Sequence, residues 1–252
     1  MTATDDTRRR AAESTPVVTV TDLEHGYDGL CVLDGVSLSV PTDAVTALVG
    51  PNGSGKSTLL RLVTGVQAPQ SGTITLPDAD APRTVGYLPQ SLRPRDGFTV
   101  RQTVETYAAL VDGGPGTDDV LSTVGLDEVT DERVDALSGG MRRLLGVAIA
   151  LVGDPPVLVL DEPTSGLDPA MTARVFDVLS DLAAAGRGVL VASHDLDAVG
   201  TNADRVVLLD QGTVQAQGPA ATVLADLDVR SLSDAFETTV ADDAGVTVRH
   251  GV

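Results

Sequence analysis

A glycine-rich segment that ends in a lysine and a hydroxyl occupies residues 50–57. It fills the pattern G-x-x-x-x-G-K-[ST] between a predicted strand at 45–49 and a predicted helix at 57–63. The glycines of such a segment let backbone amides turn inward, which makes a nest for phosphate oxygens at a helix N-terminus. The pattern therefore predicts an ATP site, with Lys56 reaching the β- and γ-phosphates and the Ser57 hydroxyl binding Mg²⁺. The residues that we expect to bind the nucleotide here are Gly50, Pro51, Asn52, Gly53, Ser54, Gly55, Lys56, Ser57 and Thr58.

Lys56 is the only lysine in the chain, although lysine and arginine together number 17. Arginine replaces lysine everywhere else, but its wide planar guanidinium does not substitute for a compact point charge at a phosphate. This bias favours a phosphate-binding function over an ordinary glycine-rich turn. We expect the ammonium of Lys56 to face solvent when no nucleotide is bound.

Two adjacent carboxylates, Asp161 and Glu162, follow the apolar run at 157–160. Ligands of parallel sheets collect at the carboxyl ends of the strands. We predict that Asp161 holds Mg²⁺, directly or through water, and that Glu162 accepts a proton from the attacking water. Taken alone, these residues fit a solvated strand end equally well, and the phosphate-binding segment is what favours catalysis.

The stretch Leu137-Ser-Gly-Gly-Met141 precedes this strand and resembles the signature motif of ABC ATPases. The resemblance extends over residues 17–218. In that family two nucleotide domains pack head to tail, with ATP between the P-loop of one and the signature of the other. The resemblance implies that Ser138, Gly139 and Gly140 complete the site of a second ABC ATPase subunit, in a homodimer or a heterodimer. A hydroxyl and exposed amides at a helix start suit this role, although they also fit a simple helix N-cap.

Four further positions match the family residue by residue. Tyr27 resembles the aromatic residue that stacks on adenine, with plain packing as the alternative. Gln90 resembles the glutamine that contacts Mg²⁺ and the attacking water. Asp168, in the stretch 165–168, resembles the carboxylate of the loop that crosses the dimer interface. His194 resembles the histidine that senses the γ-phosphate, although one histidine also fits a polar group at a helix start.

Two positions depart from the family pattern. Met141 stands where many relatives carry glutamine, and Ile149 where an arginine is common. We expect neither residue to contact the phosphates, so the departures concern partner contacts rather than hydrolysis. Every residue that the chemistry requires is present.

The elements that must position these residues alternate between apolar strands and helices, which predicts a parallel sheet with helices on its faces. With the resemblance, the fold class is α/β: a P-loop NTPase (RecA-like) core with an N-terminal antiparallel β layer and an inserted helical subdomain. The predicted strands are 17–20, 36–40, 45–49, 72–76, 157–160, 188–192, 205–210 and 213–217. The predicted helices are 57–63, 99–111, 117–124, 138–151, 170–185 and 197–200. The predicted domains are a flexible tail at 1–15, an ABC ATPase domain at 16–237 with its helical subdomain at 91–153, and a C-terminal tail at 238–252.

The chain is strongly acidic, since 17 basic against 36 acidic residues give a net charge of −19. This composition resembles proteins of salt-loving archaea, in which salt screens the self-repulsion; the alternative is an ordinary acidic protein. The negative surface argues against a nucleic-acid partner. Cys31 is the only cysteine, and no apolar segment reads as membrane-spanning or secretory. We therefore expect a cytoplasmic protein that lies on the inner face of the membrane through a partner.

The resemblance implies that this partner is a transmembrane permease subunit, which chooses the transported substrate. The stretch 98–110, together with 137–143, most resembles exporters of the ABC-2 type, and metal-ion importers are a near alternative. A soluble ABC protein, above all an iron–sulfur assembly ATPase, is the alternative from another class. Translation factors of the family usually carry two such domains, and DNA-repair members insert a coiled coil whose heptads are not found here.

Overall fold

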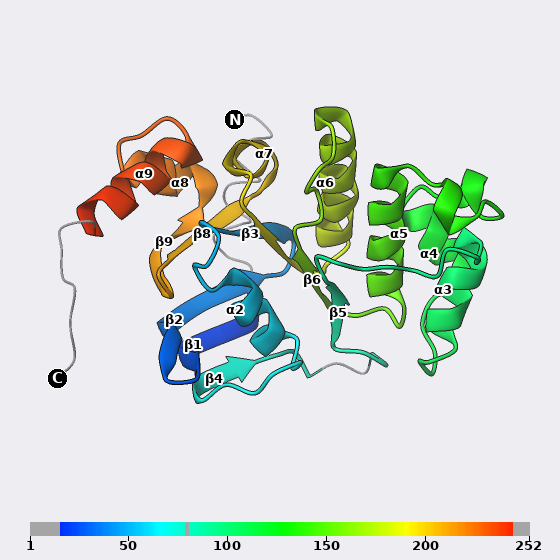
Figure 1. The fold of residues 1–252 in the computed structure, drawn as a ribbon, viewed down its shortest axis with the longest axis horizontal. Coiled ribbons are helices and arrows are strands. Elements are labelled where there is room, and N and C mark those ends of the chain that lie inside the picture. The colour runs from blue at the N-terminus through cyan, green and yellow to red at the C-terminus, as the bar shows by residue number, and fades with distance from the viewer. Residues whose placement is uncertain (1–15, 79–80, 244–252) are drawn as a thin grey trace.

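Two β-sheets enclose one helix, and a group of helices lies beside them (Figure 1). The computed structural model describes residues 16–78 and 81–243. The smaller sheet is antiparallel, with the strand order β2-β1-β4. Its strands are β1 (Pro16–Tyr27), β2 (Leu30–Pro41) and β4 (Ser71–Thr75). It is the predicted N-terminal β layer.

The larger sheet has six strands in the order β5-β6-β7-β3-β8-β9. All neighbours in it are parallel except β9, which pairs antiparallel with β8. The strands are β3 (Ala44–Val49), β5 (Val85–Leu88), β6 (Val157–Asp161), β7 (Gly188–Ser193), β8 (Arg205–Asp210) and β9 (Thr213–Pro219). The predicted α/β fold of the P-loop NTPase type is confirmed.

Alternate residues of the central strands face two separate hydrophobic cores, because side chains along a strand point to opposite faces. In β6, Val157 and Val159 belong to the core shared with helix α2 (Lys56–Val63) and the smaller sheet. Leu158 and Leu160 belong to the core shared with the helices on the opposite face. The central strands β3, β6 and β7 are thus buried on both sides, which explains why they read as nearly continuous apolar runs.

The helices of the second face fall into two groups (Figure 1). One group, beside β5, contains α3 (Val100–Ala108), α4 (Thr117–Thr123) and α5 (Gly139–Leu151), with short 3-10 helices at Asp127–Val129 and Val134–Ala136. The other comprises α6 (Pro169–Ala184) and α7 (Leu196–Asn202). Within residues 16–78 and 81–243, no helix is long and apolar enough to cross a membrane.

Apart from the two short 3-10 helices, one strand and two helices were not predicted: β5, α8 (Ala220–Asp226) and α9 (Leu232–Asp243). In α9, Leu232 and Ala235 are buried on one side of the helix, a pattern too short to stand out in the sequence. The helix overlaps the tail predicted at 238–252. The predicted tail at 1–15 lies outside the described residues, and the domain boundaries remain a prediction.

Candidate nucleotide-binding site

Four neighbouring parallel strands end at one edge of the larger sheet, and the predicted site follows these ends. The register aligns the last residue of β3, Val49, with the last residue of β7, Ser193. Strands β6 and β5 continue the same parallel order, so their carboxyl ends lie at this edge too. The predicted site residues at or just after the four ends are Gly50 to Thr58, Gln90, Asp161, Glu162 and His194.

A pocket of about 200 Å³ opens at this edge. It is smaller than a usual cavity for a whole small-molecule ligand, which suits the phosphates of a nucleotide better than the entire molecule. The pocket joins the glycine-rich segment to the ends of β5 and β6. Its lining residues are Val32, Asn52, Gly53, Gly55, Lys56, Ser57, Thr58, Gln90, Asp161 and Glu162.

Two glycines let the segment pass close to neighbouring strands. A Cβ added at Gly50 would lie 2.0 Å from the carbonyl oxygen of Leu209 at the end of β8. Gly55 has a φ of +106°, and a Cβ there would lie 2.6 Å from Leu33 Cδ2 of β2. Side chains are therefore excluded at both positions, and Gly55 lines the pocket with backbone atoms alone.

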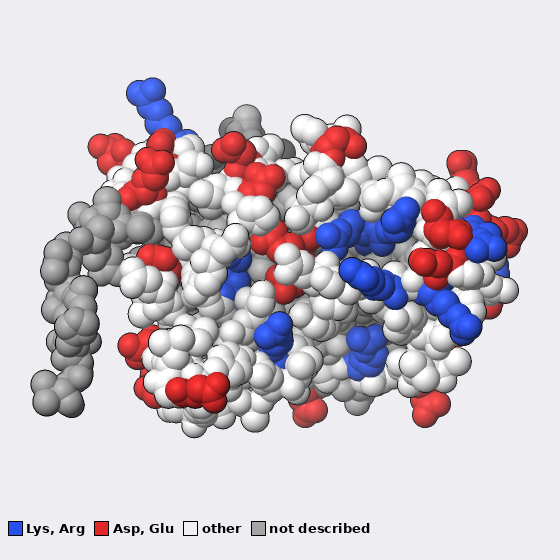
Figure 2. Space-filling model, in the orientation of Figure 1, with Lys and Arg blue, Asp and Glu red and all other residues white. Residues whose placement is uncertain are grey.

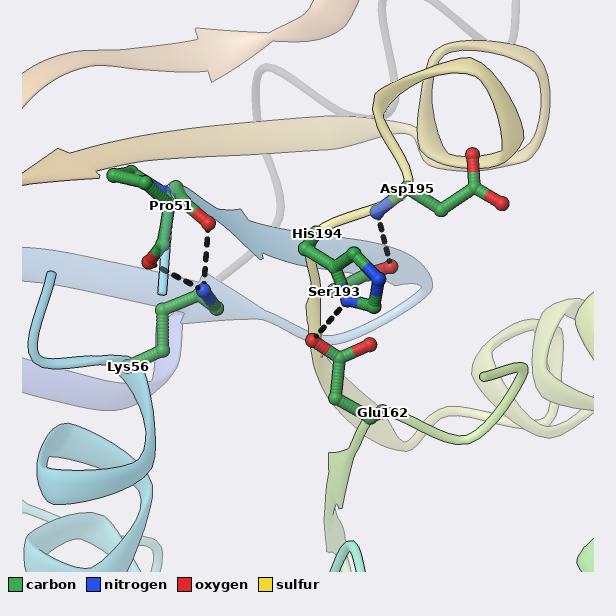
Figure 3. A network of polar contacts seen from close by, with 7 residues as sticks. Pro51, Lys56, Glu162, Ser193, His194 and Asp195 are labelled. Carbon is green, nitrogen blue, oxygen red and sulfur yellow. Dashed lines mark hydrogen bonds and ion pairs between the residues drawn. The ribbon is translucent and has the colours of Figure 1, made fainter. Parts of the chain in front are cut away.

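Lys56 corrects one prediction, because its side chain is buried rather than facing solvent, with 7% of the residue exposed. Its Nζ donates to the carbonyl oxygens of Gly50, at 2.6 Å, and Pro51, at 3.0 Å (Figure 3). A desolvated ammonium needs such acceptors. Burial lowers the pKa of Lys56, while the carboxylates of Glu162 and Asp161 raise it. The lysine is thus held within the glycine-rich loop.

Asp161 and Ser57, the carboxylate and the hydroxyl predicted to bind Mg²⁺, are hydrogen-bonded to each other. Burial raises the pKa of Asp161, whereas a hydrogen bond from Ser57 and the charge of Lys56 lower it. No cluster of three or more His, Cys, Asp or Glu side chains that could cage a metal occurs within 16–78 and 81–243. Mg²⁺ typically takes one or two protein carboxylates and completes its shell with phosphate oxygens and water. The pair fits that ion.

Glu162 and His194 contact each other across the ends of β6 and β7. The Oε1 atom of Glu162 lies 2.8 Å from Nδ1 of His194 (Figure 3). Glu162 is buried and has a φ of +53°, a strained conformation for a residue with a side chain. Its backbone N–H donates to the carbonyl of Ala192 at 2.9 Å, which fixes it to β7. The sequence predicted both residues, but not their contact.

Gln90 lies just after β5, exposed at the pocket. Its backbone carbonyl oxygen accepts a hydrogen bond from Nη1 of Arg143 at 3.0 Å. Arg143 belongs to α5, the helix that starts directly after Ser138. Nothing in the sequence marks Arg143 as the partner of Gln90, because an arginine in a helix is usually a solvated surface residue.

The signature residues and Asp168 lie at the N-termini of α5 and α6 and are not among the described residues that line the pocket. Ser138 Oγ accepts from the N–H of Met141 at 3.2 Å, and Asp168 Oδ1 from that of Met171 at 3.0 Å. Both side chains are helix N-caps, as the simpler interpretation of Ser138 predicted. A Cβ added at Gly139 would lie 3.8 Å from Leu167, so the two helix starts are neighbours.

Tyr27 ends β1 at the surface, with 38% of the residue exposed. It pairs with Leu30 across the β1–β2 hairpin, two residues before Val32, which lines the pocket. Its hydroxyl donates to Oε1 of Gln67 at 2.6 Å. The ring is not a core side chain, which argues against plain packing.

A protein-family model described as ABC transporter matches residues 33–165. This chain belongs to the ABC transporter ATP-binding proteins. It is 36% identical to the Nod factor export ATP-binding protein I of Ralstonia nicotianae, over 81% of this chain and 68% of that one. It is 35% identical to the phosphate import ATP-binding protein PstB 2 of Natronomonas pharaonis, over 83% of this chain and 82% of that one. A solved structure described as an ATP binding subunit of an ABC transporter shares the fold, with a TM-score of 0.76, 24% identity, and 89% and 99% of the chains covered.

The predicted family and ATPase activity are thereby confirmed, since ABC ATP-binding cassettes are ATPases coupled to transport. The direction of transport does not follow from the family. One of the two relatives is described as an export protein and the other as an import protein.

Proposed function

We propose that this chain is the ATP-hydrolysing subunit of an ABC-2 type exporter, and that a transmembrane permease holds it at the inner, cytoplasmic face of the membrane. The observation that carries the ATP-hydrolysing role is the pocket that gathers the P-loop, Gln90, Asp161 and Glu162 at one sheet edge. The stretch 98–110, which most resembles exporters, lies in α3 and the residues around it. The helical subdomain at 91–153 would present this helix to the permease.

The proposed division of labour follows the placement of the side chains. The P-loop amides and Lys56 bind the phosphates, and Lys56 exchanges the carbonyls of Gly50 and Pro51 for phosphate oxygens. Mg²⁺, held by Ser57 and Asp161, supplies charge stabilisation when it is bound. Glu162 accepts a proton from the attacking water, and Gln90 helps to place that water. His194 orients the carboxylate of Glu162 through the 2.8 Å contact. Such catalysis is positioning and electrostatic stabilisation rather than covalent chemistry.

The same proposal requires a second subunit, identical to this one or homologous. The nucleotide would lie between the P-loop of one subunit and the residues Ser138, Gly139 and Gly140 of the other. The separation of these glycines from the pocket of their own chain supports this arrangement. Asp168 follows Leu167, which lies beside Gly139 of the signature, so Asp168 would face the same interface.

An importer ATPase is the second candidate, and the similarity to a phosphate import protein favours it. A soluble ABC ATPase of the iron–sulfur assembly type is the third. Co-purification with a multi-spanning membrane protein, after co-expression with the products of neighbouring genes, separates the first two from the third. Inverted membrane vesicles then separate export from import, because ATP added outside drives an exporter to load the vesicle lumen. Purification without any membrane protein would contradict the transporter proposal.

The net charge of −19 supports a further part of the proposal, that the protein works in concentrated salt. Figure 2 shows acidic side chains spread over the elements of the visible face, with basic side chains gathered mainly towards the helical group. Screening by salt weakens the repulsion among such carboxylates.

A further inference from the structure

Two glutamines hold the strand end that carries Tyr27. Gln67 and Gln70 lie in the segment between α2 and β4 and belong to none of the motifs above. Oε1 of Gln67 accepts the hydroxyl hydrogen of Tyr27 at 2.6 Å. Gln67 is half-buried, so its side chain is less mobile than a fully exposed one, and this favours the hydrogen bond to the tyrosine hydroxyl.

Gln70 binds the peptide just before the ring. Its Oε1 accepts from the N–H of Gly26 at 2.9 Å, and its Nε2 donates to the carbonyl of Gly26 at 3.1 Å. Gly26 is itself constrained, because a Cβ there would lie 2.3 Å from the carbonyl oxygen of Leu30. Both backbone groups ahead of Tyr27 are therefore satisfied by one side chain, which fixes the direction in which the ring leaves the strand.

The segment with the two glutamines is in turn tied to the helix that starts in the P-loop. The N–H of Gln67 donates to the carbonyl of Arg61, in the last turn of α2, at 3.1 Å. This helix has eight residues from Lys56 to Val63. At 1.5 Å per residue it spans about 12 Å, so the phosphate end and the ring end of the site are attached to opposite ends of one rigid element.

A third contact comes from His25, two residues before Tyr27. Its ring meets the Tyr27 ring edge to face, with centroids 5.1 Å apart and an interplanar angle of 82°. His25 is buried, so its ring has little freedom to move and restrains the Tyr27 ring that packs against it. Tyr27 is thus restrained at its hydroxyl, at its backbone and at one side of its ring, although more than a third of the residue is exposed.

We propose that Gln67 and Gln70 are positioning residues that hold the Tyr27 ring ready for a nucleotide base, and so make the site prefer nucleoside triphosphates to base-free polyphosphate. This inference rests on the proposed function, in which Tyr27 stacks on the base. An exposed tyrosine samples several rotamers, and binding must then overcome the entropy of ordering it. Here the hydrogen bonds restrict the ring before the ligand arrives.

The experiment compares two ligands, Mg·ATP and magnesium tripolyphosphate, whose dissociation constants are measured by calorimetry in molar KCl. Gln67→Ala should weaken ATP binding by about three- to tenfold, the range expected from one lost hydrogen bond, and leave tripolyphosphate binding unchanged. Gln70→Ala should act in the same direction. Gln67→Glu keeps an acceptor for the tyrosine hydroxyl and should restore wild-type affinity.

A matched control removes a similar hydrogen bond elsewhere. Gln217 is exposed on β9, and its side chain donates to the carbonyl of Ser37 at 3.1 Å, away from the base end of the site. Gln217→Ala should leave the affinities for both ligands unchanged. Equal weakening of both ligands by Gln67→Ala would overturn the proposal, since a general loss of structure would act on the phosphates as well.

A double-mutant cycle tests the hydrogen bond itself. Tyr27→Phe keeps the ring and removes the donor, so Gln67→Ala should have no further effect in that background. Tyr27→Ala distinguishes the proposed role of Tyr27 from the proposed role of the two glutamines. If it leaves the preference for ATP over tripolyphosphate intact, the proposed role of Tyr27 is wrong. If it abolishes the preference while Gln67→Ala and Gln70→Ala preserve it, only the positioning role is overturned.

Discussion

Replacing Glu162 by glutamine exchanges one carboxylate oxygen for an amide nitrogen and changes little else in the site. The side chain is buried, and glutamine fills the same volume. The backbone conformation at φ +53° and the hydrogen bond from its N–H to Ala192 do not depend on the side chain. The amide can still bond to Nδ1 of His194, 2.8 Å away, as donor or acceptor. The free energy of unfolding should therefore change by no more than about 1 kcal/mol, the typical effect of a single substitution.

Turnover should fall far more than stability. If Glu162 is the proton acceptor, its loss should lower the rate of ATP hydrolysis by a factor of about 10² or more, the usual contribution of a general base. That factor corresponds to about 2.7 kcal/mol of transition-state stabilisation, at 1.36 kcal/mol per tenfold change. ATP affinity should stay the same or rise slightly, because a negative charge near the phosphates is removed while Lys56 and Ser57 are untouched.

The assay measures phosphate release and ATP binding on the same preparation in molar KCl. Unhydrolysed ATP should then hold two subunits together, so Glu162→Gln should form ATP-dependent dimers in size-exclusion chromatography that the wild type does not accumulate. Adding Ser138→Arg should abolish them, because it puts bulk and charge where the second subunit meets the nucleotide. A Glu162→Gln protein that hydrolyses ATP at a near-normal rate would refute the role of Glu162 and make His194 the next candidate.

Three other perturbations have defined outcomes. Lys56→Ala should abolish most ATP binding. It should also lower the free energy of unfolding by about 1–3 kcal/mol, because the carbonyls of Gly50 and Pro51 lose their buried donor. Retained micromolar affinity in a titration would show that Lys56 does not hold the phosphates. Asp161→Asn should raise the melting temperature of the nucleotide-free protein at neutral pH and abolish Mg²⁺-dependent hydrolysis. Burial raises the pKa of Asp161, so its charged form destabilises the fold; this destabilisation is fully present above the raised pKa, fades as the pH falls through it, and is gone below the usual aspartate value. An unchanged melting temperature would contradict the sign. Thermal melts in KCl from about 0.1 M to about 1 M should rise steadily as the Debye length falls from about 10 Å to about 3 Å, whereas a flat curve would show that the carboxylates of this chain, net charge −19, are spaced too widely to repel.

The sequence predicted the parts of the site that depend on local pattern. The glycines of residues 50–55 and the carboxylates after an apolar run could be assigned a function, because the residue types and their order are enough to predict a phosphate site and a metal site. The core strands were found for the same reason, since strands buried on both faces read as apolar runs. Strand β5 was missed because Val85–Leu88 is short and contains Gly86, which lies close to the carbonyl of Ala150.

The contacts between distant residues could not be predicted. His194 lies 32 residues after Glu162, and their contact depends on the register of two strands. Tyr27 and Gln67 are 40 residues apart, and nothing in the segment after α2 marks the glutamine as a partner. The buried state of Lys56 also escaped prediction, because it depends on two carbonyls of a loop whose backbone path the sequence does not show.

The claim that two subunits form each ATP site together is tested most directly by mixing two variants, one defective in the P-loop and the other in the signature. Lys56→Ala removes the phosphate lysine, and Ser138→Arg blocks the signature; each protein alone should fail to hydrolyse ATP. In the mixture, a heterodimer pairs the intact P-loop of one subunit with the intact signature of the other, so phosphate release should return. Ser138→Arg protein that hydrolyses ATP at the wild-type rate by itself would contradict this arrangement, because the site would then be complete within one chain.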